Sequence, residues 1–141
     1  MQNTTFEKVI IHTDGGSRGN PGPSACGYTI QDSQGRIIDS GGEYIGITTN
    51  NIAEYQAVKI ALEKALSYGF KNIEFYLDSL LVVNQMINIF KIKNRELWPI
   101  HEDIKRLLGN FGKVTFTHIP RERNKLADSE VNKILDSYEK R

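Results

Sequence analysis

The order of its apolar segments restricts the possible folds of this chain most strongly. Three runs rich in β-branched residues come first, joined by short, turn-like connections, which predicts an antiparallel meander. Helix-like and strand-like segments then alternate. The expected strands are residues 8–14, 24–31, 36–47, 72–77 and 114–119. The expected helices begin at 49–51, 79, 95 and 123 and end near 68, 90, 108 and 138.

This order predicts an α/β fold. Strands that are connected through a helix usually pair in parallel, with a right-handed crossover. We therefore expect a five-stranded mixed sheet in which strands one to three are antiparallel and strands one, four and five are parallel, with helices on both faces. A length of 141 residues fits a single domain over residues 1–141.

Composition excludes several classes of protein. Eighteen Lys and Arg against seventeen Asp and Glu give a net charge of +1, so bulk charge does not indicate a nucleic acid or an anionic membrane as partner. The single cysteine, Cys26, excludes an internal disulfide framework and a Cys-rich zinc site. With no signal peptide in MQNTTFEKV, a cytoplasmic location is expected. No apolar run approaches the ~20 residues of a membrane span. Because no phosphate-binding glycine motif is present, no small-molecule cofactor is expected, and a monomer is the default.

Four acidic residues stand at the ends of strands or the starts of helices. Asp14 and Asp78 each follow an expected strand, whereas Glu54 and Asp128 lie near the start of an expected helix. Singly, each has an ordinary structural explanation, as a turn aspartate, a capping residue or a solvated acid at a helix start. Glu54 fits that explanation least well. It shares a helical face with Val58 and other apolar residues that should pack on the sheet, where an unpaired carboxylate is costly.

Together, the four acids predict a metal site. If strands one and four are adjacent and parallel, Asp14 and Asp78 lie side by side at the edge of the sheet where ligands bind in open α/β folds. The helix starts that carry Glu54 and Asp128 can face the same edge. Like charges ~4 Å apart repel by ~4 kcal/mol at an effective dielectric constant of about 20, so such a cluster needs protons or cations. Oxygen ligands select Mg²⁺ or Mn²⁺, and a pair of such ions suits in-line displacement at phosphorus.

Four motifs, in matching order and spacing, resemble the type 1 ribonuclease H family. They are DGGSRGNPGP at 14–23, TTNNIAEYQA at 48–57, the strand-end pair Asp78-Ser79, and HIPRERNKLAD at 118–128. The resemblance covers the chain from about residue 9 to residue 138. It implies the ribonuclease H fold and endonucleolytic hydrolysis of the RNA strand of RNA–DNA hybrids, which leaves 5′-phosphate and 3′-hydroxyl ends.

The resemblance also implies how the acids act. Asp14, Glu54, Asp78 and Asp128 would be the catalytic residues and would bind two Mg²⁺ ions, with Mn²⁺ as a possible substitute. One ion would activate the attacking water, and the other would stabilise the leaving 3′-oxygen. No covalent intermediate is expected, so no nucleophilic serine or cysteine is required.

The chain departs from the bacterial branch of this family in two places. Bacterial members carry a mobile histidine in the loop before the last acid, to which proton transfer or product release is attributed, but residues 120–127 contain none. The compact archaeal-type members share that absence and resemble the chain in this loop. His118 falls on the strand before the loop and is interpreted as a strand-end residue. The basic protrusion of some bacterial members is not evident, and no N-terminal hybrid-binding domain is expected.

Candidate substrate-binding residues flank the acids. A hybrid exposes the 2′-hydroxyls of its RNA strand in the minor groove, and glycines after Asp14 would let the backbone approach them. Thr49 is a candidate phosphate anchor at a helix start. Asn50 and Asn51 resemble the minor-groove readers of the family, with helix capping as the alternative. The full set of candidates is Gly15, Gly16, Ser17, Gly19, Asn20, Thr49, Asn50, Asn51, Lys91, Lys93, Asn94, Arg121, Arg123 and Asn124.

Two other functions stay open on the sequence alone. One is a non-catalytic nucleic-acid-binding module with the same fold, against which the presence of all four acids argues. The other is a different nuclease on that fold, such as an exonuclease or a junction resolvase, because one fold hosts many functions. The TTNN and DGGSRGNPG motifs favour the hybrid-specific enzyme.

Overall fold

The computed structural model describes residues 8–87, 92 and 95–139 of the chain. Within these residues, the strands are β1 (Lys8–Ser17), β2 (Gly22–Gln31), β3 (Ile37–Thr48), β4 (Asn72–Leu77) and β5 (Val114–His118). The helices are α1 (Asn50–Tyr68), α2 (Leu80–Met86), α3 (Trp98–Leu108) and α4 (Lys125–Glu139), with short 3₁₀ turns η2 (Arg95–Leu97) and η3 (Arg121–Arg123). No helix in this part of the chain is long and apolar enough to cross a membrane.

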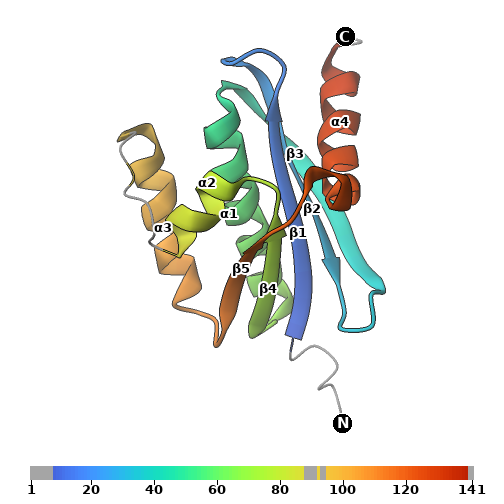
Figure 1. Ribbon diagram of the computed structural model, residues 1–141, viewed down its shortest axis with the longest axis vertical. Helices are drawn as coiled ribbons and strands as arrows, with labels where there is room; N and C mark the ends of the chain where they lie inside the picture. Colours follow the sequence, from blue (N-terminus) through green and yellow to red (C-terminus); the bar gives the residue numbers. More distant parts are fainter. Residues whose placement is uncertain (1–7, 88–91, 93–94, 140–141) are drawn as a thin grey trace.

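The strands form one mixed sheet in the order β3-β2-β1-β4-β5 (Figure 1). β2 pairs antiparallel with both β1 and β3, whereas β4 pairs parallel with both β1 and β5. The predicted α/β class and strand pairing are therefore confirmed. β1 is longer than predicted, because the glycine-rich residues 15–17 continue the strand and pair with residues 24–26 of β2.

Helices cover both faces of the sheet, as predicted (Figure 1). α1 packs on β1 and β2 with α3 beside it, whereas α4 packs across β1, β2 and β3 on the opposite face. The main core lies between the sheet and α1, where Tyr55, Leu62 and Phe75 are completely buried. A smaller core under α4 contains Val131 and Leu135.

α1 has the ends that the sequence predicts, whereas the starts of α3 and α4 differ from the prediction. α1 is capped by Thr49, whose Oγ1 accepts a hydrogen bond from the Ile52 amide, and it ends at Gly69, which adopts the left-handed conformation with φ +81°. The helix expected from residue 95 begins instead as η2, and Pro99 stands in the first turn of α3, where its missing N–H is tolerated. The last helix starts at Lys125 because η3 precedes it.

Candidate active site

Three of the predicted acids converge where the parallel pairing of β1 and β4 ends. Asp14 stands in β1, Asp78 directly follows β4, and Glu54 projects from the first turns of α1. Each offers one carboxylate oxygen, and these three oxygens lie within 4.8 Å of one another. Asp14 is 7% exposed, and the other two are partly buried. The three acids thus meet although Glu54 is 40 positions from Asp14, and Asp78 is 24 positions from Glu54, in the sequence.

Asp128 lies beside this group, in the first turn of α4. It is not one of the three acids whose oxygens fall within 4.8 Å. A side-chain hydrogen bond nevertheless joins it to Asp14, and its Oδ2 accepts a hydrogen bond from Asn132 Nδ2 at 3.3 Å. The four predicted acids are therefore neighbours, three in a tight group and the fourth bonded to Asp14.

Burial and neighbouring charges disfavour the ionised forms of Asp14 and Glu54. The pKa of Asp14 is raised to about 9, first by burial, then by the charges of Glu54 and Asp78 and by the hydrogen bond to Asp128. Burial, followed by the charge of Asp78, raises the pKa of Glu54 to about 8, although the Gly15 amide and the charge of Arg121 act in the opposite direction. A divalent cation would compensate the negative charge that protons otherwise compensate here.

The donor chemistry of this site fits a hard divalent cation. All three converging groups are carboxylates, and oxygen donors are the ligands that Mg²⁺ and Mn²⁺ prefer. Cys26, the one sulfur donor in the neighbourhood, is buried and directs its Sγ to the Ala53 carbonyl oxygen at 3.3 Å. Burial raises the pKa of its thiol well above the ordinary range, so Cys26 acts as a small buried side chain.

Gly15 allows α1 to approach β1 closely enough to bring in Glu54. The Gly15 amide donates a hydrogen bond to Glu54 Oε1 at 3.0 Å. A Cβ atom at position 15 would lie 2.2 Å from the carbonyl carbon of Ala53, so any side chain would push α1 away from the sheet. Gly15 is buried. The missing side chain of Gly15 therefore serves an internal contact, and the substrate contact expected of this residue stays a prediction.

Gly27 has the same effect on the other face of the sheet. A Cβ atom there would lie 2.5 Å from the carbonyl oxygen of Ala127 in α4. Because Ala127 directly precedes Asp128, this close contact of β2 with α4 helps to hold Asp128 near Asp14. Gly27 of β2 pairs with Asp14 of β1, so this close contact with α4 lies at the same level of the sheet as Asp14.

Asn124 fixes the orientation of Asp78. Its side chain is completely buried, and its Nδ2 donates to the Thr13 carbonyl oxygen at 2.8 Å and to Asp78 Oδ2 at 3.1 Å. These bonds give Asn124 a structural role, and the substrate contact expected of it stays a prediction. Since both amide hydrogens are used within the protein, Asn124 connects the start of α4 to β1 and to the acid after β4.

Comparisons with known protein sequences show the family of this chain. A sequence model described as "Reverse transcriptase-like" matches residues 12–134. The chain is 34% identical over 150 residues to a ribonuclease H of Clostridium botulinum, a match covering 94% of this chain and 99% of that protein. The chain belongs to the ribonuclease H family. It is also 40% identical over 129 residues to the ribonuclease HI of Halobacterium salinarum, with 92% of this chain covered.

Solved ribonuclease H structures share the fold. The crystal structure of the H. salinarum ribonuclease H1 matches with a TM-score of 0.89 at 40% identity, over 92% of this chain and 98% of that chain. LC11-RNase H1 in complex with an RNA/DNA hybrid matches with a TM-score of 0.89 at 39% identity, over the same shares. The chain spans 65% of the full H. salinarum protein and 36% of a bifunctional Mycobacterium tuberculosis protein that is 34% identical over 131 residues.

The turn after β1 is attached to the start of α1 by hydrogen bonds. The Ser17 amide donates to Asn50 Oδ1 at 2.9 Å, and the Asn50 amide donates to Asn20 Oδ1 at 3.0 Å. Thr49 rather than Asn50 or Asn51 provides the side-chain cap of α1. These bonds are structural roles, and the substrate contacts expected of these residues stay predictions.

The remaining candidates from the ribonuclease H resemblance lie in two regions. Arg121 and Arg123 are exposed on η3, and the effect of Arg121 on the pKa of Glu54 shows that its charge reaches the acids. Gly16 and Gly19 lie at and beyond the end of β1, and Gly19 takes a φ of 102° that favours glycine. The expected basic contacts at Lys91, Lys93 and Asn94 lie outside the described residues.

Sequence reasoning missed two residues that contact the acids or their partners. Asn132 stands four residues after Asp128 on the same helix, a spacing at which side chains meet, so that spacing alone could have indicated it. Arg18 gave no such signal, because its partners in α4 lie more than a hundred residues away in sequence.

Proposed function

We propose that this chain is an endonuclease that hydrolyses the RNA strand of RNA–DNA hybrids, using divalent cations held by the acidic site. The observation that carries the proposal is the convergence of Asp14, Glu54 and Asp78 from three separate elements within 4.8 Å. Membership of the ribonuclease H family supports it. The structural similarity to a relative solved with an RNA/DNA hybrid supports the choice of substrate.

The chain's own residues prepare the site for cations. Asp14, Glu54 and Asp78 would hold them, with Asp128 at the side of Asp14. Two Mg²⁺ ions, or Mn²⁺ in their place, would supply Lewis-acid polarisation and charge neutralisation at the scissile phosphate. The Gly15 amide orients the Glu54 carboxylate and Asn124 orients that of Asp78, so that little rearrangement precedes binding. Cation binding would displace the protons favoured by the raised pKa values of Asp14 and Glu54.

Arginines occupy the loop in which bacterial relatives carry a histidine. Arg121 and Arg123 are exposed in this loop, and the charge of Arg121 acts on Glu54. A guanidinium group can attract a phosphate but is not a general acid or base near neutral pH. We assign both arginines phosphate contacts in the substrate complex. Phosphate contacts fix the register of a duplex without reading its bases, so cleavage should be largely independent of sequence.

A substrate panel tests this function. One sequence is prepared as RNA–DNA hybrid, duplex DNA and duplex RNA, and each is incubated with the protein in Mg²⁺, in Mn²⁺ and in EDTA. The expected result is metal-dependent cutting of the hybrid's RNA strand alone, into fragments with 5′-phosphate and 3′-hydroxyl ends. Comparable cutting of duplex DNA would instead indicate a different nuclease on this fold. Hybrid binding without cutting would indicate a non-catalytic module.

A matched pair of variants assigns the activity to the site. Glu54→Gln replaces a carboxylate of the cluster by an amide with little change in shape, whereas Glu63→Gln makes the same change at an exposed position of the same helix. Cutting should be lost in the first and kept in the second. Equal activity in both would place the chemistry elsewhere.

A further inference from the structure

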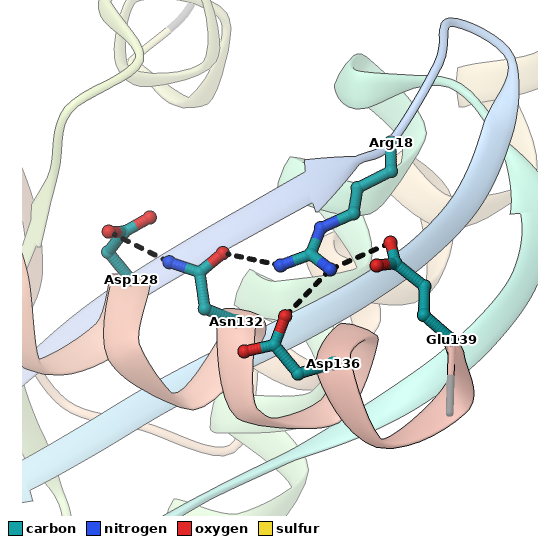
Figure 2. A network of polar contacts seen from close by, with 5 residues as sticks. All are labelled: Arg18, Asp128, Asn132, Asp136 and Glu139. Atoms are coloured by element: carbon teal, nitrogen blue, oxygen red, sulfur yellow. Dashed lines mark hydrogen bonds and ion pairs between the residues drawn. The ribbon is translucent and has the colours of Figure 1, made fainter. Parts of the chain in front are cut away.

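A chain of polar contacts runs along α4 from Asp128 to the turn after β1 (Figure 2). Asn132 Nδ2 donates to Asp128 Oδ2 at 3.3 Å, and Arg18 Nη2 donates to Asn132 Oδ1 at 3.3 Å. Arg18 Nη1 also pairs with Asp136 Oδ1 at 2.8 Å and with Glu139 Oε2 at 2.7 Å. The four α4 residues recur at helical spacing, so they present one stripe to the arginine.

We propose that Arg18 is a positioning residue for Asp128 and acts through Asn132. A guanidinium group only donates hydrogen bonds, whereas a primary amide has one donor end and one acceptor end. Arg18 can therefore meet only the oxygen of the Asn132 amide, which leaves the NH₂ group turned toward Asp128. Without Arg18, the amide could rotate and present its oxygen to the carboxylate. The proposal rests on the proposed function, because it assigns Asp128 a place beside the cations.

Arg18 is itself held from two sides. Its amide donates to the Pro23 carbonyl oxygen at 2.8 Å, which ties it to the beginning of β2. Its side chain, 32% exposed, spans Asp136 and Glu139 in the last turns of α4. Acidic residues near a helix C-terminus are unfavourable there, so the arginine offsets their charge. Partly exposed ion pairs of this kind add little to stability, so their main effect here is to fix the guanidinium.

The two roles of Arg18 can be separated by substitution. Asn132→Ala breaks the contact with Asp128 but leaves the ion pairs of Arg18 in place, and alanine suits an exposed helix position. Arg18→Lys keeps a charge for Asp136 and Glu139 but loses the fork that reaches Asn132 at the same time. Arg18→Ala removes both roles. Lys133→Ala is the matched control, because Lys133 neighbours Asn132 but, among the described residues, forms its ion pair with Glu130, at 3.3 Å.

The test measures Mn²⁺ binding by calorimetry without nucleic acid, and the Mg²⁺ concentration that gives half-maximal hybrid cleavage. Residues that orient metal ligands typically change metal affinity by about 10–100-fold. Because these contacts are exposed and long, we expect a loss of about three- to tenfold for Arg18→Ala, Arg18→Lys and Asn132→Ala. The double variant Arg18→Ala/Asn132→Ala should lose no more than either single variant. Lys133→Ala should bind Mn²⁺ like the unchanged protein, and Asn132→Ala should unfold at an unchanged temperature.

Two results would overturn the positioning role. One is unchanged Mn²⁺ affinity in both Arg18→Ala and Asn132→Ala, which would leave Arg18 as a structural contact only. The other is a double variant whose loss equals the product of the single losses, which would mean that the two residues act independently. An unchanged protein that binds Mn²⁺ but cuts no hybrid would refute the proposed nuclease, and the calorimetric comparison would still decide on Arg18.

Discussion

At the scale of single residues, the fold buries carboxylates whose ionised form cation binding requires. Asp14 and Glu54 are brought into a poorly solvated cluster in which burial and neighbouring charges raise both pKa values. The folded protein without metal therefore holds protons that the unfolded chain releases. The placement of these acids was predictable, because each follows a strand or begins a helix. The role of Asn124 was not, because its partner Thr13 lies 111 residues away.

Without metal, the protein should become less stable as the pH rises. The pKa values of Asp14 and Glu54, about 9 and about 8 when folded, lie above the ordinary 3.8 and 4.5. Between these limits the unfolded chain binds fewer protons, so the free energy of unfolding falls with pH. The stabilising contribution is complete below about pH 4 and is lost as the pH passes through the folded values. Thermal unfolding in EDTA over this range should show the fall.

Repeating the experiment with Asp14→Asn, and with Mg²⁺ added, tests whether the acids of the site cause the fall in stability with pH. Asp14→Asn should flatten the dependence of unfolding temperature on pH, because one of the two acids is gone. Excess Mg²⁺ should raise the unfolding temperature most at high pH, where cations replace the missing protons. An unchanged slope in Asp14→Asn would show that other groups cause the fall.

Asn124→Ala should destabilise the protein and slow cleavage. The substitution leaves the buried Thr13 carbonyl group without its donor and frees the Asp78 carboxylate. An unsatisfied buried group costs about 1–3 kcal/mol, which urea unfolding can resolve. Asn110→Ala is the control, since Asn110 is exposed and its side chain donates to the carbonyl oxygens of Arg106 and Leu107 at the end of its own helix. Equal stability in the two variants would contradict the role given to Asn124.

For the helices and strands, close packing rather than intrinsic propensity decides the geometry of the site. Element order and type followed from the sequence, because apolar periodicity and turn residues are local signals. The C-terminal end of β1 did not, because a Gly-Gly pair resembles a turn. In the fold these glycines continue the strand, since α1 and α4 press on its two faces. Such a contact between distant segments leaves no local pattern.

Gly15→Ala should separate α1 from β1. Its Cβ atom would lie 2.2 Å from the Ala53 carbonyl carbon, and α1 must move to relieve the clash. Overpacking of this kind costs about 1–3 kcal/mol. Cleavage should fall as well, because Glu54 moves with α1. Gly109→Ala is the control, because Gly109 has a helical φ of −63° and its nearest contact, Arg106 O, is at 3.3 Å. Stability is measured by urea unfolding and activity by hybrid cleavage. Equal stability and equal activity in the two variants would contradict the close packing of α1 on β1.

For the molecule as a whole, function depends on gathering four distant segments around one point. The parallel pairing of β1 and β4 places two acids, and helices on opposite faces bring the others. Net charge is only +1, so attraction of a polyanionic duplex must come from local groups such as Arg121 and Arg123. Residues 91–95 are also expected to attract the duplex, but most of them lie outside the described residues.

Hybrid binding should therefore weaken as salt increases. Each phosphate contact releases counterions, so the logarithm of affinity should fall linearly with the logarithm of salt concentration. Fluorescence anisotropy with the inactive Asp14→Asn variant can measure this without cutting. Replacing Arg121 and Arg123 by alanine should reduce the slope by about one per lost contact. If the double replacement leaves the slope unchanged, neither arginine contacts the phosphates of the duplex.

Cleavage of one hybrid labelled on both strands tests the central claim most directly. The unchanged protein and Asp14→Asn are compared side by side, each with Mg²⁺ and with EDTA. We predict that only the RNA label is released, only by the unchanged protein and only with Mg²⁺. Release of the RNA label in EDTA, or by Asp14→Asn at the unchanged rate, would contradict hydrolysis at this cluster of acids.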